Sequence, residues 1–298
     1  MQQVKSKSKE LFSPGHTACA GCGLAIGARL VIEAAGSETI IANATGCLEV
    51  TTSKYPQSSW GVPWIHSLFE NAAAVASGIQ ASLNQKGLNK KVKVIAQGGD
   101  GATYDIGFGL ISGMWERNED IMYVCYDNEA YMNTGVQASG ATPYAAHTTT
   151  TPQGLESIGS TFRKKNMADI AIAHNLAYVA TSSVGYPLDI QNKIKKALTF
   201  NGPTYVQILV PCVPGWGTDS KDTITLGKLA HQTGLWPIFE AVNGKVGKTM
   251  PFPKKRPPVE EYLKLQKRFA HLFKKPNGKN EIKKIQKIAD DNAEKYTI

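Results

Sequence analysis

The sequence lacks long hydrophobic segments. Across its 298 residues, no window approaches the roughly 18 consecutive apolar residues that a membrane-spanning helix requires. The first seven residues are basic, but no apolar stretch follows them, so they do not form a secretory signal. These two absences predict a protein that has no membrane segment and remains in the cytoplasm.

Cysteine is scarce, with five residues in the whole chain. Cytoplasmic thiols stay reduced, so spaced cysteines there bind metal more often than they form disulfides. Cys19 and Cys22 form a Cys-x-x-Cys pair, and Cys47 and Cys212 follow further along the chain. Cys125 lies inside an apolar run instead, which predicts a buried packing residue.

Nucleic-acid-binding patterns are missing as well. The sequence has no zinc-finger or RRM pattern, and its lysines are not interleaved with aromatic residues, which argues against a nucleic-acid partner. The net charge of +9 comes largely from lysines in the last quarter of the chain. This basic segment is either a solvated surface or a docking surface for an acidic partner or subunit.

Strand and helix signals alternate between residues 38 and 210. Apolar strands are expected at 38–43, 92–96, 121–126, 177–181 and 205–210. Helices are expected between them at 67–83, 105–115, 167–175 and 187–198, with a long loop at 128–152. Strands without a polar face that alternate with helices predict an α/β fold, with a parallel sheet covered by helices on both faces.

The alternating pattern fades after residue 213. We therefore expect two parts: an α/β domain at 1–213 that carries the functional sites, and a basic C-terminal extension at 214–298. One helix is expected in the extension, at 259–272. Its charge suggests that the extension docks onto another subunit.

A second group of polar residues follows two of the predicted strands. Gly99, Asp100 and Gly101 come after the strand at 92–96, and Asn128 comes after the strand at 121–126. Glycine N–H groups can face phosphate oxygens, and aspartate and asparagine oxygens suit Mg²⁺. The alternative to a shared binding site is that these residues belong to two unrelated turns, because Gly, Asp and Asn are common at strand ends. Because ligands bind at the carboxyl ends of parallel strands, we expect these residues and the spaced cysteines to share one sheet edge.

At these residues the sequence resembles the thiamine diphosphate (TPP)-binding β subunits of pyruvate:ferredoxin oxidoreductases, or pyruvate synthases, in the 2-oxoacid:ferredoxin oxidoreductase family. The resemblance covers roughly residues 10–240. It rests on the segments GHTACAGCG at 15–23, GDG at 99–101 with DN at 127–128, and YMNTGVQ at 131–137 with TPY at 142–144.

The resemblance implies that TPP and Mg²⁺ bind at this sheet edge. Asp100 and Asn128 would bind Mg²⁺ through their side chains, and Ala130 through its backbone carbonyl. Asn133 would be the catalytic polar group beside the thiazolium ring and the substrate. The full set of implied cofactor-binding residues is Gly99, Asp100, Gly101, Ala102, Asn128, Ala130 and Asn133.

The resemblance also implies one [4Fe–4S] cluster near the thiazolium ring. Its ligands would be Cys19, Cys22, Cys47 and Cys212, and four thiolates suit such a cluster. From the residues alone, a structural zinc ion and a redox-active Cys-x-x-Cys pair remain as alternatives.

The implied reaction is the coenzyme A-dependent oxidative decarboxylation of pyruvate to acetyl-CoA and CO₂, or its reverse, with electrons passed to ferredoxin. An α subunit would supply the pyrimidine-binding domain and its glutamate, because this chain has one α/β array. Ferredoxin-like γ and δ subunits would carry electrons onward. Three alternatives stay open: the same chemistry on 2-oxoglutarate, a branched-chain 2-oxo acid or oxalate; a non-redox TPP-dependent lyase; and a non-catalytic electron-transfer or structural subunit.

Overall fold

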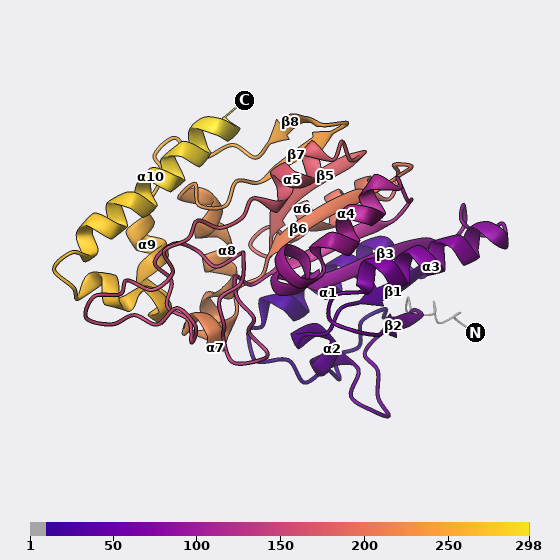
Figure 1. The fold of residues 1–298 in the computed structure, drawn as a ribbon, viewed down its shortest axis with the longest axis horizontal. Helices are drawn as coiled ribbons and strands as arrows, with labels where there is room; N and C mark the ends of the chain where they lie inside the picture. Colours follow the sequence, from indigo (N-terminus) through magenta and orange to yellow (C-terminus); the bar gives the residue numbers. More distant parts are fainter. Residues whose placement is uncertain (1–9, 298) are drawn as a thin grey trace, which may run out of the picture.

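The computed structural model describes residues 10–297, which form one eight-stranded sheet with helices packed on it (Figure 1). The basic residues 1–7 lie outside this range. The strand order is β2-β1-β3-β4-β6-β5-β7-β8. The first six strands in this order run parallel to one another. They are β1 (Thr39–Asn43), β2 (Trp64–His66), β3 (Lys93–Gly99), β4 (Met122–Asp127), β5 (Tyr178–Ser183) and β6 (Thr204–Leu209).

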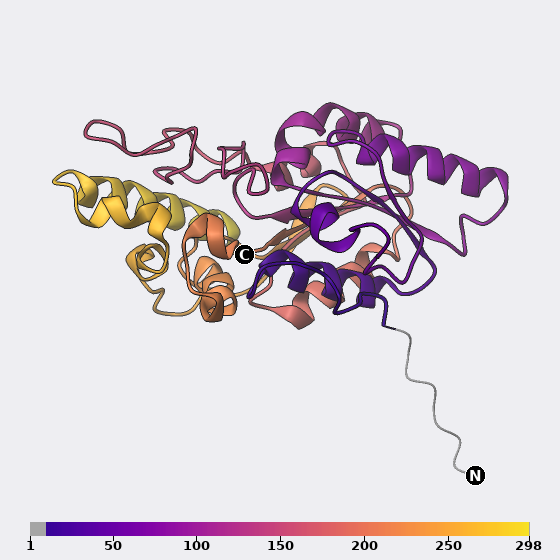
Figure 2. The ribbon, with the colours of Figure 1, turned by 90° about the horizontal axis from the view of Figure 1, so that it is seen from below.

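Helices cover both faces of the sheet, as predicted (Figure 2). On one face lie α1 (Gly23–Ala35) and α6 (Pro187–Ala197), and on the other α3 (Ala72–Gln85), α4 (Phe108–Glu116) and α5 (Met167–Ala173). Every residue of β4, β5 and β6 is buried. Burial on both faces explains why these strands carry no alternating polar pattern.

Local signals set the ends of several of these helices. Helix α6 begins at Pro187, whose fixed φ suits a first helical position, and ends with Lys195 and Lys196 near its negative C-terminus. Helix α5 follows Asn166, whose side-chain oxygen accepts a hydrogen bond from the Asp169 N–H at 3.1 Å.

The helix predicted at 105–115 begins earlier than expected. A π-helix, η1 (Gly101–Ile106), precedes α4 and brings residue 101 into helical structure. Its wide turn is closed by the Gly107 N–H, which donates to the Ala102 carbonyl at 3.0 Å. A side chain at residue 107 would place its Cβ only 2.3 Å from that oxygen, so glycine permits this turn.

The prediction of a single helix at 259–272 is wrong. The structure has a short helix, α9 (Val259–Lys264), and then a 3-10 helix, η3 (Lys267–Phe273). The break falls at Gln266, whose backbone is extended, with φ −129° and ψ 117°. Its side chain donates to the Tyr262 carbonyl at 2.8 Å, which satisfies a carbonyl that the ended helix leaves free.

The residues after 213 form more regular structure than the sequence pattern indicated. Strands β7 (Phe239–Val242) and β8 (Lys245–Thr249) extend the sheet beyond β5 in antiparallel order, so the sheet is mostly rather than wholly parallel. The boundary after 213 stays a prediction. The remaining helices of the described chain are α2 (Cys47–Thr52), α7 (Val213–Trp216), η2 (Ser220–Asp222), α8 (Thr223–Gln232) and α10 (Gly278–Tyr296).

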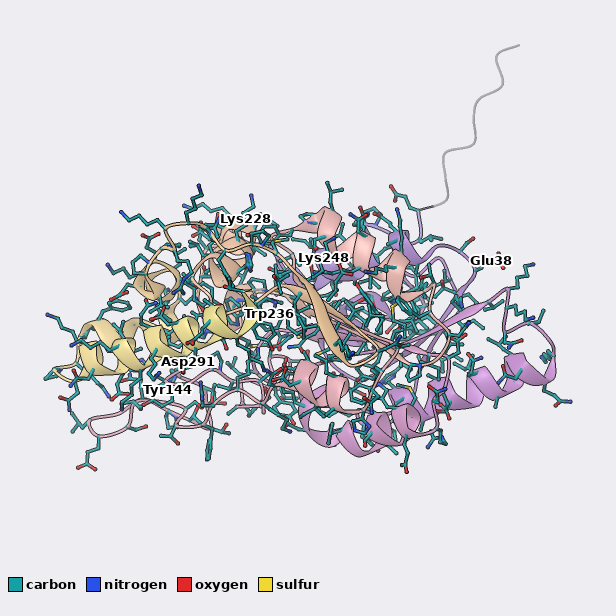
Figure 3. All side chains as sticks on the ribbon, turned by 90° about the horizontal axis from the view of Figure 1, so that it is seen from above. Glu38, Tyr144, Lys228, Trp236, Lys248 and Asp291 are labelled. Carbon is teal, nitrogen blue, oxygen red and sulfur yellow. The ribbon has the colours of Figure 1, made fainter. Side chains whose placement is uncertain are left out.

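A third apolar cluster joins this C-terminal segment to the rest of the molecule. It contains Trp216, Phe269 and Ile282 together with Ala145 and Ala146 from the loop after β4. Figure 3 shows Tyr144 of this loop and Asp291 of α10 at the same end of the molecule. Within residues 10–297, no helix has both the length and the apolar content needed to cross a membrane.

We expect the C-terminal segment to contribute to the stability of the whole fold. Ile282 of α10 is 5% exposed, and Ile282→Ala should lower the free energy of unfolding by about 2–5 kcal/mol in urea denaturation of the chain. The neighbouring Lys283 is exposed, so Lys283→Ala should change the free energy by less than about 0.5 kcal/mol. Equal effects of the two substitutions would contradict a core at this position.

Candidate functional site

A pocket of about 100 Å³ lies at the carboxyl ends of β1, β3 and β4. The loops that follow these three strands converge there because adjacent parallel strands end at the same sheet edge. All residues that the resemblance assigned to the cofactor line this pocket: Gly99, Asp100, Gly101, Ala102, Asn128, Ala130 and Asn133. The structure thus brings the predicted set together, and their roles in binding stay predictions.

Three polar groups of this set meet at one point. The side-chain oxygen of Asn128 lies 2.8 Å from Asp100 Oδ1 and 2.8 Å from the Ala130 carbonyl oxygen. As placed, the amide turns its oxygen toward both acceptors; turned over, its NH₂ group would donate to both. Neighbouring oxygens around an octahedral Mg²⁺ are about 3.0 Å apart, given Mg–O distances of about 2.1 Å. The three groups therefore suit a Mg²⁺ ion, and without one they can hydrogen-bond to each other.

Asp100 is the most deeply buried charge in this pocket, at 1% exposure. Burial raises the pKa of Asp100 well above its usual value, and the neighbouring Asp127 charge adds to the effect. Ser139 donates a hydrogen bond to one carboxyl oxygen, and the Asn128 N–H donates to the other at 3.3 Å. A buried carboxylate that lacks a paired cation favours binding of a positive ion.

Gly101 has a packing role in addition to the one predicted for it. A Cβ at this position would lie 2.2 Å from the Tyr131 ring, so no other residue fits without moving that ring. Gly101 and Ala102 also begin the π-helix η1. Their N–H groups are in the first helical turn, where no partner exists within the helix, and such groups bind anions such as phosphate.

Three of the four spaced cysteines occupy helix starts around the same sheet edge. Cys22 precedes α1, Cys47 is the first residue of α2, and Cys212 precedes α7. The Cys22 N–H donates to the Cys19 carbonyl at 3.0 Å, which folds the Cys-x-x-Cys pair into a turn. Cys47 lines the pocket, and its thiol lies 3.9 Å from the Asn133 side-chain oxygen.

A backbone contact joins the residues next to Cys22 and Cys212, although these cysteines are 190 positions apart in the sequence. The Gly23 N–H donates to the Pro211 carbonyl at 3.1 Å, which fixes the start of α1 against the end of β6. A side chain at residue 23 would clash with this same backbone, since its Cβ would lie 2.8 Å from Pro211. This close approach brings Cys22 and Cys212 to one side of the pocket.

The thiols interact electrostatically as one group. Burial, followed by the charges of Cys22, Cys19 and Asp100, raises the pKa of Cys47 to about 11. Burial is also the main reason that the pKa of Cys212 rises to about 12, and the other three spaced cysteines add to it. Metal-free Cys47 and Cys212 are therefore protonated near neutral pH, and metal binding would have to displace their protons.

The thiols do not form a closed metal site in this structure. Within residues 10–297, no three His, Cys, Asp or Glu side chains are close enough together to hold a metal ion. The Asp100 site does not count as such a cluster, because two of its three oxygen groups are the Asn128 amide and the Ala130 backbone carbonyl. Cys125 is separate from both sites: it is fully buried in β4, which confirms the prediction that it is a packing residue.

The sequence did not predict the residues that bond to the acids in and next to the pocket. Ser139 lies 39 positions after Asp100 in a loop without a regular pattern, so its bond to Asp100 had no local signal. Lys164 lies 2.8 Å from Asp127 and 3.0 Å from Glu129, at the far end of the same loop. The two acids Asp127 and Glu129, directly after an apolar strand, were the available clue, because buried acids need cations.

Comparison with known proteins agrees with this geometry. Residues 44–208 match the family model of the thiamine pyrophosphate enzyme, C-terminal TPP binding domain. The chain is 52% identical over 294 residues to pyruvate synthase subunit PorB of Methanosarcina barkeri, with 99% of each chain covered. It is also 52% identical over 289 residues to PorB of Methanocaldococcus jannaschii, with 95% of each chain covered.

Two further similarities are to a curated relative and to a solved structure. Ketoisovalerate oxidoreductase subunit VorB of Pyrococcus abyssi is 45% identical over 271 residues, which cover 89% of this chain and 87% of that one. Among solved structures, 2-oxoglutarate:ferredoxin oxidoreductase from Magnetococcus marinus has the same fold, with a TM-score of 0.58, 23% identity, and coverage of 76% of this chain and 82% of that chain. The strands, the pocket and these full-length identities together identify the chain as a member of the TPP-binding PorB subunit family of pyruvate synthases, a group of 2-oxoacid:ferredoxin oxidoreductases.

Proposed function

We propose that this chain is the β subunit of a multi-subunit pyruvate:ferredoxin oxidoreductase and binds TPP, Mg²⁺ and one [4Fe–4S] cluster. The complex would convert pyruvate and coenzyme A to acetyl-CoA and CO₂, or the reverse, with electrons passed to ferredoxin. One observation carries the proposal: the oxygen groups of Asp100, Asn128 and Ala130 lie in the same pocket as Cys47. A metal–sulfur centre beside a diphosphate site matches an oxidoreductase better than a lyase.

The pocket residues would divide the binding of TPP–Mg²⁺ between them. Asp100, Asn128 and Ala130 would hold the metal, and the N–H groups of Gly101 and Ala102 would face the diphosphate. TPP, when bound, supplies the carbanion chemistry that breaks the bond between the carbonyl and carboxyl carbons of a 2-oxo acid. Since Asp100 is buried and its pKa is raised by that burial, it gains most from a cation that neutralises both it and the diphosphate.

The four spaced cysteines would hold the cluster through their thiolates. Backbone N–H groups already point at two of these sulfurs: hydrogen bonds from Ala25 and Leu24 work to lower the pKa of Cys22 against the effect of burial. The Gly215 N–H acts in the same way on Cys212, although burial still dominates and raises the pKa of that thiol to about 12. Such donors stabilise negative sulfur and tune the potential of a bound cluster.

Asn133 is suited to couple the two parts of the site. Its side chain is exposed, lines the pocket, and lies 3.9 Å from the Cys47 thiol. A neutral amide at this position can donate to a substrate oxygen and accept from another group without adding charge. We therefore assign to Asn133 the role of orienting the substrate between the cofactor and the cysteines.

Further subunits would complete the active site. Within residues 10–297, no glutamate lines the pocket, so the glutamate that contacts the pyrimidine ring would come from an α subunit with its own α/β domain. Ferredoxin-like γ and δ subunits would pass electrons to ferredoxin, and the basic segment at 214–298 is the proposed docking region. The cytoplasmic location stays a prediction.

Removing the charge of Asp100 should separate metal binding from folding. In Asp100→Asn, Mg²⁺-dependent TPP affinity in isothermal titration should fall at least tenfold, because one anionic ligand is lost. The melting temperature of the cofactor-free chain should stay equal or rise, because burial disfavours that charge. The matched control is Asp120→Asn. Asp120 is partly exposed and precedes β4, at the opposite edge of the sheet, so its replacement should leave both measurements unchanged. Unaltered TPP binding in Asp100→Asn would overturn the metal assignment.

The iron content should distinguish the spaced cysteines from Cys125. Anaerobically purified wild-type chain should hold about four irons and four sulfides, with a broad brown absorbance. Cys47→Ser should lose most of both, whereas Cys125→Ser should keep them and lose only some stability, since Cys125 is buried within β4. Equal iron loss in the two variants, or zinc in place of iron, would refute the cluster assignment.

The assembled complex should show the activity and the isolated chain should not. With viologen dye or ferredoxin as acceptor and coenzyme A present, we expect pyruvate to be preferred over 2-oxoglutarate and branched-chain 2-oxo acids. The isolated chain should show no dye reduction, because the pyrimidine-side glutamate is missing. Preference for a branched-chain acid would move the assignment toward the activity named for the VorB relative. Robust turnover by the isolated chain would reject the need for an α subunit.

A further inference from the structure

The metal-binding loop contains one residue in an unfavourable backbone conformation. Glu129 has a φ of 69°, in the left-handed region that residues other than glycine seldom adopt. It stands between Asn128, whose amide lies 2.8 Å from Asp100, and Ala130, whose carbonyl oxygen lies 2.8 Å from the same amide. This conformation turns the chain so that the two flanking oxygens face the same point.

Two cations, the buried Arg268 and the partly exposed Lys164, hold the Glu129 side chain on the opposite side of the loop. Arg268 Nη2 lies 2.5 Å from one carboxylate oxygen, and Lys164 Nζ lies 3.0 Å from the other. The side chains of Glu129 and Arg268 are 7% and 4% exposed. Arg268 belongs to η3, and the two residues are 139 positions apart in the sequence. The C-terminal segment therefore reaches back to the loop that carries the oxygen groups.

A second contact from the C-terminal segment fixes the backbone of this loop. Trp216, which is fully buried, donates its indole N–H to the Asn128 carbonyl oxygen at 2.8 Å. The Arg268 guanidinium stacks on the same indole, with its carbon 3.9 Å from the ring centroid. Arg268 also donates to the Gln266 side chain at 2.9 Å. Arg268 is thus oriented on two sides while it bonds to Glu129.

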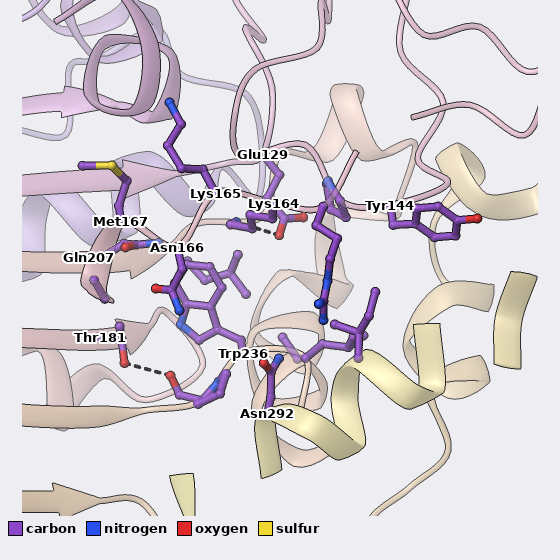
Figure 4. A pocket seen from close by; sticks show the side chains of 18 of the residues that line it. Glu129, Tyr144, Lys164, Lys165, Asn166, Met167, Thr181, Gln207, Trp236 and Asn292 are labelled. Atoms are coloured by element: carbon purple, nitrogen blue, oxygen red, sulfur yellow. Dashed lines mark hydrogen bonds and ion pairs between the residues drawn. The ribbon is translucent and has the colours of Figure 1, made fainter. Parts of the chain in front are cut away.

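Packing alone does not support the loop at Glu129. A cavity of about 490 Å³ lies beside it, lined by Glu129, Lys164, Tyr144 and Trp236 among others. Figure 4 shows Lys164 and Glu129 joined at the wall of this cavity, with Trp236 nearby. The carboxylate of Glu129 is held by its ion pairs with Lys164 and Arg268, whereas its backbone N–H donates to Asp127 at 3.1 Å and its carbonyl accepts from the Thr142 hydroxyl at 3.0 Å.

We propose that Arg268, together with Lys164, positions the metal-binding loop through Glu129 and thereby sets the affinity of the site for Mg²⁺. The proposal rests on the function proposed above. Arg268 is a positioning residue, because it touches Glu129 and not the metal groups. When Arg268 is lost, Glu129 is left charged and partly unpaired, its φ can relax, and the oxygens of Asn128 and Ala130 no longer face Asp100 together.

The test measures metal binding by the assembled complex, with Mn²⁺ as the probe in place of Mg²⁺ and TPP in excess. Free Mn²⁺ is followed by EPR, and binding by Asp100→Asn is subtracted as the background from other sites. In Arg268→Met we expect Mn²⁺ affinity to fall about 10–100-fold, as for other outer contacts of a metal site. Arg268→Lys should restore most of it. The control, Arg256→Met, removes an ion pair of 2.5 Å to the half-exposed Asp290 in the same segment and should leave affinity unchanged.

A double variant separates positioning from general stability. Glu129→Gln with Arg268→Met removes the unpaired buried charge, so the melting temperature should recover relative to Arg268→Met alone. Mn²⁺ affinity should stay low, because the contact that orients the loop is still missing. Should Arg268→Met fail to assemble, Glu129→Gln, which keeps the side-chain shape, decides the question through the same loss of affinity.

The outcomes distinguish this inference from the proposed function. Folded variants that bind Mn²⁺ as tightly as the wild type overturn the positioning role of Arg268 and leave the TPP–Mg²⁺ site intact. A double variant that regains affinity together with its melting temperature also overturns it, because stability alone would then explain the loss. A wild-type complex that binds no Mn²⁺ with TPP overturns the proposed function, and this inference with it.

Discussion

The burial of negative charge at the end of β3 and β4 is the constraint on which the rest of the site depends. Asp100, Asp127 and Glu129 are all buried, and they lie within a few residues of two adjacent strand ends. Burying carboxylates is unfavourable unless cations accompany them. Lys164 pairs with both Asp127 and Glu129, and Arg268 pairs with Glu129. Asp100 alone has no basic side chain within ion-pair distance in the described chain.

This unequal pairing gives the acids different properties. Burial works to raise the pKa of Glu129, but Lys164 and Arg268 outweigh it and the pKa falls below its usual value. For Asp100, burial and Asp127 together raise the pKa well above the usual range. Glu129 is therefore a fixed structural anion, whereas Asp100 is the one whose charge a metal ion would stabilise. The two acids differ because Glu129, in the loop after β4, contacts Arg268 of the C-terminal segment, whereas Asp100, directly after β3, lines the pocket.

The parallel sheet explains why sulfur and oxygen groups meet. Each crossover returns the chain to the same edge, so Cys47 after β1, Asp100 after β3, Asn128 after β4 and Cys212 after β6 are neighbours in space. The Cys19–Cys22 turn precedes α1 and reaches this edge through the Gly23–Pro211 contact. Full-length identity to PorB subunits fits this arrangement, since the matched residues include all of the sheet strands.

The sequence by itself determined the α/β class, the strands that carry the pocket, and the residues around it, because apolar strands and Gly-Asp-Gly or Cys-x-x-Cys segments are local signals. It did not reveal the antiparallel strands β7 and β8, the break at Gln266, or the partners of the buried acids. Those depend on contacts such as Arg268 with Glu129 and Ser139 with Asp100, which join residues 139 and 39 positions apart. No local pattern encodes which distant cation will neutralise a buried carboxylate, so only the tertiary structure decided how the C-terminal segment contacts the loop after β4.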